Sequence, residues 1–165
     1  MLFSSARALR VVAVLMAALS IAACAKNAED ENSALAGRGG YAAPGSPQDF
    51  VVNVGDRVFF ETDSSELTPT AQATLDKQAD WLQRYGRYSF TVEGHADERG
   101  TREYNFALGA RRAEVAKNYL VSRGLSAARI RTISYGKERP VAVCDDISCW
   151  SQNRRAVTVL SGGSS

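Results

Sequence analysis

Histidine, cysteine and long apolar runs are scarce in this chain of 165 residues, and each scarcity excludes a class of function. His95 is the single histidine, whereas zinc peptidases and amidases usually draw on two or three. No Gly-x-Ser-x-Gly and no Cys-x-x-Cys occurs, so neither a nucleophile elbow nor a dithiol redox motif is present. We therefore expect no enzyme activity, no cofactor and no bound metal.

No apolar run reaches the roughly 20 residues that a membrane-spanning helix needs. The run Val11–Leu19 follows Arg7 and Arg10 and precedes an Ile-Ala-Ala-Cys sequence that ends at Cys24. A positive region, a short apolar region and small residues in this order are typical of an export signal. Because the cysteine directly follows two alanines, the segment resembles the lipobox of bacterial lipoproteins. This resemblance implies that residues 1–23 are removed and that Cys24 is acylated.

Acylation at Cys24 provides a lipid anchor, since two or more acyl chains such as palmitate hold a protein stably at a membrane. Ala25 stands where the resemblance places an aspartate for inner-membrane retention, so we expect the outer membrane, with the domain facing the periplasm. Residues 24–49 are rich in Ala, Gly, Ser and Asn and lack periodicity, which predicts a flexible tether. A coil of this length spans about 25 to 30 Å between its ends.

An excess of charge of one sign is also lacking. The chain has 20 basic and 18 acidic residues, and two of the basic residues, Arg7 and Arg10, lie in the expected signal. The remaining chain is neutral, so no polybasic surface for nucleic acid is indicated. Its length suffices for one compact domain and leaves no surplus for a second.

Periodicity predicts one folded domain over residues 50–160, followed by a frayed tail at residues 161–165. Strand patterns and helical spacing alternate along this domain. Strands are expected within residues 50–60, at Phe90 and Val92, and over residues 130–135 and 155–160, and helices over residues 69–86 and 101–123. The order strand, helix, strand, helix, strand, strand predicts an α+β fold, a two-layer α/β sandwich with both helices on one sheet face.

Local signals support both helices. Thr68 offers an N-cap oxygen and Pro69 a first-turn proline to the first helix. Trp81 and Tyr85 are expected to pack on its flank, because aromatic residues at helical spacing usually serve cores. The second helix is expected to end at Gly124. Its inward side chains are predicted to be Tyr104, Leu108, Val115 and Tyr119.

Two cysteines remain if Cys24 is acylated. Cys144 and Cys149 can form a disulfide, because disulfides persist in exported proteins. So short a loop contributes only about 2 kcal/mol in the chain-entropy model. The alternative is a metal site with His95 as a third ligand, but structural zinc sites usually space their cysteines more closely.

Polar residues are concentrated where the strand at Val92 leads into the second helix. Asn105 and Arg112 are seven residues apart on one helical face, and Asp97 precedes the helix. A carboxylate, an amide and a guanidinium can receive a zwitterion, with its ammonium toward Asp97 and its carboxylate toward Arg112. Two alternatives are a surface ion pair for Arg112 and an acid/base role for Asp97 with Glu93, although strand-end and capping residues explain these carboxylates better. Spacing alone leaves the role of Arg112 open.

Four segments carry a resemblance to a known family. They are Thr91–Ala113 with its Gly-His-Ala-Asp-Glu-Arg-Gly-Thr run, Val58-Phe59-Phe60 with Asp63, Ser134–Pro140, and Asn153–Val157. In these segments the chain resembles the OmpA C-terminal-like family, and the resemblance covers most of the expected domain. It implies an OmpA-like fold and noncovalent binding of the diaminopimelate side chain in the peptidoglycan stem peptide.

Site residues and partners follow from the resemblance. Asp97 and Arg112 match the family's two principal contact positions, and Asp63, Asn105 and Leu108 match further positions of the same site. The implied role links the outer membrane to the cell wall within the Tol system, whose periplasmic propeller protein is a partner in envelope integrity and cell division. The alternatives are a wall-anchoring lipoprotein without Tol partners and a cell-wall hydrolase.

The chain departs from the family pattern in three places. Thr62 replaces a usual aromatic residue before Asp63, Arg102 stands where close relatives often have proline, and Cys144 and Cys149 lie in the last loop. None of these changes involves the two principal positions. We expect Asp97 and Arg112 near the surface, so that alanine at either position leaves the fold intact.

Overall fold

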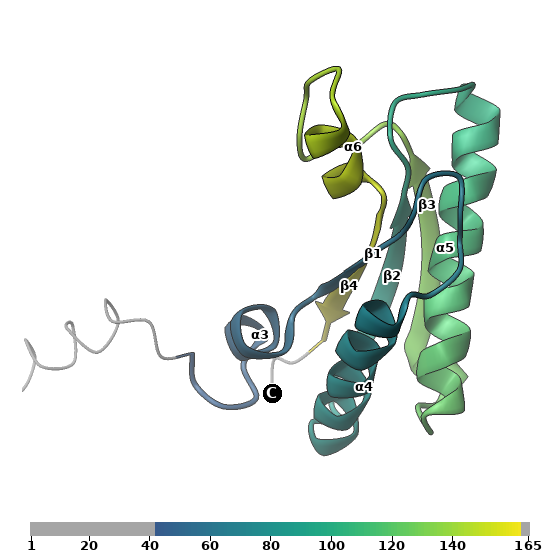
Figure 1. Cartoon of the computed structure of the whole chain (residues 1–165). Helices are drawn as coiled ribbons and strands as arrows, with labels where there is room; N and C mark the ends of the chain where they lie inside the picture. The colour runs from purple at the N-terminus through teal and green to yellow at the C-terminus, as the bar shows by residue number, and fades with distance from the viewer. Residues whose placement is uncertain (1–41, 163–165) are drawn as a thin grey trace, which may run out of the picture. The chain divides into compact units, whose positions relative to one another are not determined.

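The computed structural model describes residues 42–162 (Figure 1). The predictions for the export signal, for Cys24, for the tether up to residue 41 and for the last tail residues lie outside the described residues. Within the described part of the chain, no helix has the length and apolar character that crossing a membrane requires.

Four strands form one mixed sheet. They are β1 (Arg57–Phe59), β2 (Ser89–His95), β3 (Ile130–Gly136) and β4 (Arg155–Ser161). In the order β1-β4-β2-β3, β4 runs antiparallel to both of its neighbours, whereas β2 and β3 are parallel. Parallel strands need a crossover, and the long helix after β2 provides it.

Two long helices pack on the same face of this sheet (Figure 1). The helical elements are α3 (Pro47–Asp49), the π-helix η1 (Phe50–Val54), α4 (Pro69–Arg84), α5 (Arg102–Ser122), the 3₁₀ helix η2 (Ala127–Arg129) and α6 (Ile147–Asn153). The predicted fold class and the order of the principal elements are confirmed. Val58, Phe90, Val92 and Ala156 turn toward the helices and form part of the core.

The predicted helix starts are also confirmed. Thr68 caps α4, where its hydroxyl oxygen accepts a hydrogen bond from the backbone N–H of Ala71 at 3.1 Å, and Pro69 occupies the first turn. Thr101 caps α5 in the same way, with a 3.2 Å bond from Tyr104 N–H. Each cap satisfies one of the backbone donors that a helix start leaves free.

The strand predicted at residues 50–54 is wrong, because this segment forms the π-helix η1. Phe50 is buried against Trp81, with 4.9 Å between ring centroids, and the Asp49 carboxylate accepts a 2.8 Å bond from Trp81 Nε1. Among the described residues this segment pairs with no strand, and its apolar pattern reflects the packing of one aromatic residue, Phe50. Residues before Phe50 take part in the fold, since Gly45 O accepts a 2.8 Å bond from the Tyr88 hydroxyl.

The buried face of α5 is rotated by about one residue position from the predicted face. Tyr104 is 46% exposed, whereas Asn105, Leu108, Arg112 and Ala116 are buried. Val115 and Tyr119 are only partly buried. Positions three, four and four residues apart define one helical stripe, and Tyr104 lies just beside it. At the other end of the domain, β4 includes Ser161, one residue beyond the predicted boundary.

Two glycines let α5 lie directly on the sheet. A Cβ atom on Gly94 of β2 would lie 1.8 Å from the carbonyl oxygen of Gly109, and one on Gly109 would lie 2.5 Å from Ser134 Oγ. No side chain fits between these backbones, so helix and strand make close backbone contact. This contact lies between Leu108 and Arg112 along the helix, and it sinks that face of α5 deeply into the protein.

Candidate functional site

The candidate site is a cavity of about 270 Å³ where the loops at one end of the sheet meet the start of α5. The loop after β1, the loop between β2 and α5, and the first turns of α5 contribute to it. Its lining residues are Thr62, Asp63, Asp97, Arg99, Gly100, Tyr104, Asn105 and Leu108. The structure thus brings together four of the five predicted binding residues, all except Arg112.

Asp97 supplies the buried negative charge of the cavity. It is only 7% exposed, so its predicted surface position is wrong. One carboxylate oxygen accepts bonds from Arg99 Nη2 at 2.7 Å and from Arg154 Nη1 at 3.4 Å. Burial favours the neutral form, but the hydrogen bonds from Arg99, its charge and the bond from Arg154 hold the pKa of Asp97 below its ordinary 3.8. The carboxylate is therefore ionised at neutral pH.

The loop between β2 and α5 is held in place by bonds to its backbone. Asn105 Nδ2 donates to Arg99 O at 2.7 Å, and Lys137 Nζ donates to Glu98 O at 3.0 Å and to Gly100 O at 2.7 Å. Gly100 has a φ of 87°, a conformation that side-chain-bearing residues rarely adopt. Asn105 therefore shapes the cavity through this loop, which is fixed before any ligand arrives.

Asp63 lines the cavity from the loop after β1. Its φ of 56° is unusual for a residue other than glycine, although aspartate tolerates this region better than most. The Asp63 carboxylate accepts a hydrogen bond from the Tyr104 hydroxyl, and this bond raises the pKa of Tyr104. Thr62 also lines the cavity, so the departure from the family pattern does reach its wall.

Arg112 lies beneath the cavity, with an exposure of 0%, so its predicted surface position is wrong. It donates from Nε to Ser64 O at 2.8 Å, from Nη1 to His95 O at 2.8 Å and from Nη2 to Glu61 O at 3.1 Å. Burial and the charge of Arg154 lower the pKa of Arg112 to about 10, so it remains a cation at neutral pH. Its donors thus bond three backbone carbonyls, and within the described part of the chain Arg112 forms no ion pair.

Sequence reasoning missed Arg154 as a site residue. This buried side chain donates from Nε to Phe60 O at 3.0 Å and places its Nη1 beside Asp97. It thus connects the residue after β1, the residue before β4 and the loop after β2. A signal was present, since two consecutive arginines at the start of a strand are costly to bury unless they have acceptors.

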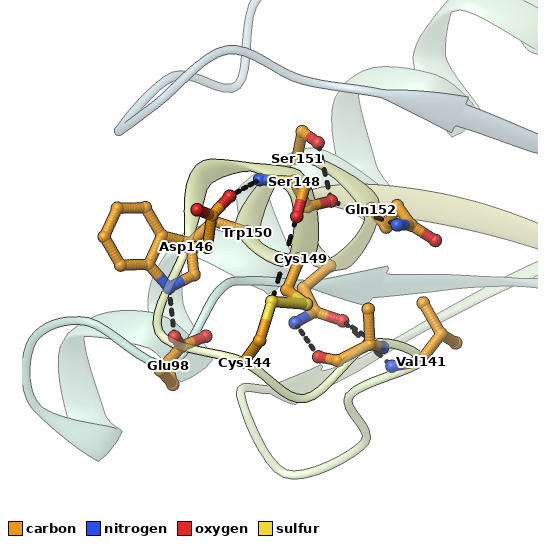
Figure 2. Close-up of a disulfide and its surroundings, with 11 residues drawn as sticks. Glu98, Val141, Cys144, Asp146, Ser148, Cys149, Trp150, Ser151 and Gln152 are labelled. Carbon is orange, nitrogen blue, oxygen red and sulfur yellow. Dashed lines mark hydrogen bonds between the residues drawn. A yellow bond between two sulfur atoms is a disulfide. The ribbon is translucent and has the colours of Figure 1, made fainter.

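Cys144 and Cys149 are joined by a disulfide, with 5.7 Å between their Cα atoms, at the start of α6 (Figure 2). Trp150 follows directly, and Figure 2 shows its indole Nε1 directed at the Glu98 carboxylate, to which it donates a hydrogen bond. The Arg99 guanidinium lies 4.1 Å from the centroid of the Trp150 ring. The short bridged loop therefore ends beside the cavity, which the sequence did not indicate.

His95 is 1% exposed, and neither of its ring nitrogens has a hydrogen-bond partner among residues 42–162. Burial, followed by the charges of Arg155 and Arg139, lowers its pKa to about 4. It is therefore neutral at pH 7, and its 3.7 Å approach to Glu93 is no ion pair. The His95 ring therefore contributes packing, and its backbone oxygen accepts a hydrogen bond from Arg112.

Other hollows of the described chain are also lined by charged residues, but these differ from the candidate site in the exposure of their charges. In residues 42–162, no cluster of three or more His, Cys, Asp or Glu side chains could hold a metal ion. A larger hollow of about 590 Å³ lies between α5 and the end of β3, but its Arg102 and Glu138 side chains are exposed and pair with each other at 3.1 Å. The smaller cavity combines the buried Asp97 carboxylate with the partly exposed Arg99 guanidinium in its lining, an arrangement that can accept a ligand carrying an amine and a carboxylate.

Known proteins resemble the chain over this domain and beyond it. Residues 59–154 match the OmpA family. A peptidoglycan-associated lipoprotein of Rhizobium meliloti (strain 1021) is 63% identical over 157 residues, which cover 94% of this chain and 89% of that protein. A protein of the same name from Brucella melitensis biotype 1 (strain ATCC 23456 / CCUG 17765 / NCTC 10094 / 16M) is 60% identical over 161 residues, covering 96% of this chain and 95% of that one.

Solved structures share the fold. The crystal structure of the peptidoglycan-associated lipoprotein from Burkholderia pseudomallei superposes with a TM-score of 0.66 at 36% identity, covering 70% of this chain and all of that one. The C-terminal domain of MotB from Helicobacter pylori superposes with a TM-score of 0.62 at 22% identity, covering 66% of this chain and 86% of that one. At that identity the second likeness concerns the fold alone.

Proposed function

This chain belongs to the OmpA family, and from that premise we propose that its domain binds peptidoglycan noncovalently through the diaminopimelate side chain of the stem peptide. The observation that carries the proposal is Asp97, an ionised carboxylate at the bottom of a small cavity. Further support comes from the names of the relatives, which describe them as associated with peptidoglycan. Diaminopimelate ends in an amine and a carboxylate, and the cavity offers a charge for each.

Within this proposal, Asp97 receives the ligand ammonium. Asp63 lines the cavity from the loop after β1, Leu108 contributes apolar contact, and Asn105 holds the loop that carries Asp97. Arg112 supports the site from beneath by binding the loop after β1, and its charge favours the ligand carboxylate above it. The ligand need not displace any backbone carbonyl from Arg112.

The wider role is proposed from the family and the sequence. An acylated Cys24 anchors the chain in the outer membrane, the tether spans part of the periplasm, and the domain holds the cell wall. The proposed partners are the proteins of the Tol system, including its periplasmic propeller protein, with a role in envelope integrity and cell division. A wall-anchoring lipoprotein without Tol partners has the same binding site and differs only in those contacts.

Replacing Asp97 by asparagine is expected to weaken binding to purified sacculi by at least about tenfold, because a charge-assisted bond contributes about 1.5–3 kcal/mol. Pelleting of the soluble chain (residues 25–165) with sacculi measures this effect. Asp80→Asn is the matched control, since Asp80 is exposed on α4, far from the cavity lining. Melting curves of both variants separate loss of binding from loss of fold. Equal pelleting of the Asp97 variant and the control would place the binding site elsewhere.

The same experiment tests the hydrolase alternative. Steady release of muropeptides by the wild-type chain would show that the chain cleaves the cell wall, and it would overturn the proposal of a binding protein. Ser134 and Lys137 have the Ser-x-x-Lys spacing of some acyl-transfer enzymes. The two side chains do not bond each other, however. Ser134 Oγ donates to Phe106 O at 2.7 Å, and Lys137 Nζ donates to the loop after β2. We therefore expect pelleting without released fragments.

Replacing Cys24 by serine is expected to move the chain from the membrane fraction to the soluble periplasmic fraction, because a serine at this position cannot carry the thioether-linked lipid. Fractionation of cells that produce either form measures the distribution. Sacculus binding by the soluble form should be unchanged, since residue 24 lies outside the binding domain. Retention of the serine variant in membranes would contradict a lipid anchor at this residue.

A further inference from the structure

Arg99 occupies the carboxylate that the proposed ligand needs. Its Nη2 donates to one oxygen of Asp97 at 2.7 Å, while its Nε and its backbone N–H both donate to the other oxygen at 3.2 Å. Both carboxylate oxygens are therefore already bonded. An incoming ammonium can bind Asp97 fully only if the Arg99 side chain moves away.

Of the two arginines at Asp97, only Arg99 is free to move. Its side chain is 39% exposed, and the donors of its guanidinium have no other acceptor among the described residues. Arg154, by contrast, is buried and is also fixed to Phe60 O at 3.0 Å. Arg154 therefore stays beside Asp97 when a ligand binds, and Arg99 is the side chain that is exchanged.

The Trp150 ring can hold the Arg99 side chain both before and after this exchange. The guanidinium already lies 4.1 Å from the centroid of the Trp150 ring, a distance typical of a cation–π contact. The ring itself is fixed, because Nε1 bonds Glu98 and the adjacent Cys149 is tied to Cys144 (Figure 2). Arg99 can therefore rotate away from Asp97 while it keeps its contact with the ring.

We propose that Arg99 acts as an internal stand-in for the ligand ammonium and makes the site selective for a zwitterion over a simple amine. This inference rests on the proposed function and adds a specificity-determining residue to it. A diaminopimelate end brings an amine that takes over Asp97 and a carboxylate that takes over Arg99, so every charge keeps a partner. A lysine side chain brings the amine alone and leaves Arg99 without its carboxylate.

Two synthetic stem tripeptides test the exchange. One carries diaminopimelate and the other carries lysine in its place, and both are amidated at the peptide C-terminus, so that they differ in one carboxylate. Titration calorimetry with the soluble chain (residues 25–165) is expected to show at least about tenfold tighter binding of the diaminopimelate peptide. In Arg99→Ala, the diaminopimelate peptide should bind more weakly and the lysine peptide more tightly, so that the preference falls at least about tenfold.

Arg131→Ala is the matched control, because it removes the same charge from an exposed position on β3. Its preference should equal that of the wild-type chain. Tryptophan emission gives an independent readout, since the Arg99 guanidinium shifts over the Trp150 ring when it leaves Asp97 in the wild-type chain, and this shift cannot occur in Arg99→Ala. A ligand-induced change in emission is thus expected only when Arg99 is present.

The outcomes distinguish this inference from the proposed function. Equal weakening of both peptides in Arg99→Ala, or an unchanged preference, would make Arg99 an ordinary contact and overturn the exchange while diaminopimelate binding stands. Failure of the wild-type chain to bind the diaminopimelate peptide would overturn the proposed function, and the exchange with it. A lost preference together with tighter lysine binding is the result that only the exchange predicts.

Discussion

Replacing Arg112 by alanine is expected to lower the free energy of unfolding by about 3–5 kcal/mol, a large part of a small domain's stability. The carbonyl oxygens of Glu61, Ser64 and His95 all accept hydrogen bonds from this guanidinium. Without it the carbonyls of Ser64 and His95 lose this partner, whereas Glu61 O keeps the 3.2 Å bond from Ser64 N–H. Each buried carbonyl that stays unpaired costs about 1–3 kcal/mol. Urea denaturation of the soluble chain (residues 25–165) measures the loss.

Two variants control for charge and for position. Arg111→Ala removes a neighbouring charge from an exposed site on α5 and should change stability by no more than about 0.5 kcal/mol. Arg112→Lys keeps the cation but cannot reach three carbonyls in three directions, so its stability should lie between wild type and alanine. An Arg112→Ala variant as stable as Arg111→Ala would show that these three bonds contribute little. Loss of sacculus binding by Arg112→Ala therefore does not by itself make Arg112 a ligand contact.

The position of Arg112 shows what helical spacing can and cannot predict. Intervals of three and four residues correctly placed Asn105, Leu108 and Arg112 on one face of α5. They could not predict the depth of that face, because depth is set by the contact between Gly94 and Gly109, which belong to different elements. A surface guanidinium and a buried one have the same spacing in the sequence.

Local sequence signals were sufficient to predict an element where nearby residues alone determine its structure. Thr68 caps its helix as its side-chain chemistry predicts, and the alternation around Phe90 does correspond to a strand. Short elements were missed because their stability comes from partners elsewhere. The segment that begins at Phe50 depends on Trp81, and α6 depends on its disulfide and on Asn153, which bonds the backbone of the preceding loop.

Of the five site residues assigned from the family resemblance, Asp97 and three others line one cavity, and their contact with a ligand stays a prediction. Asp97's partner Arg99 comes from the same loop and its partner Arg154 lies directly before β4, and only the folded chain brings the latter within 3.4 Å. Whether a carboxylate is free or already paired is a tertiary property, and it decides what the ligand must displace.

Stability is expected to fall by about 2 kcal/mol when the pH is lowered from 7 to 5, because His95 is buried in its neutral form. Its pKa is lowered from 6.5 to about 4 in the folded chain, so between these values the unfolded chain binds a proton that the folded chain does not. Above pH 6.5 both states hold a neutral ring, and the effect is absent. By pH 4 the loss reaches about 3 kcal/mol.

His95→Phe is the matched variant for this prediction. It keeps an aromatic ring beside Tyr135, whose ring centroid lies 5.5 Å away, and it sacrifices no hydrogen bond, since both ring nitrogens lack partners in the part of the chain that the structure describes. Urea denaturation at pH 7 and pH 5 should show a strong dependence on pH in the wild-type chain and little in the variant. Asp97 does not blur this comparison, because its lowered pKa places the corresponding loss of stability below pH 4. An equal loss in both proteins would assign the pH dependence to other groups and would leave His95 as a residue that only packs.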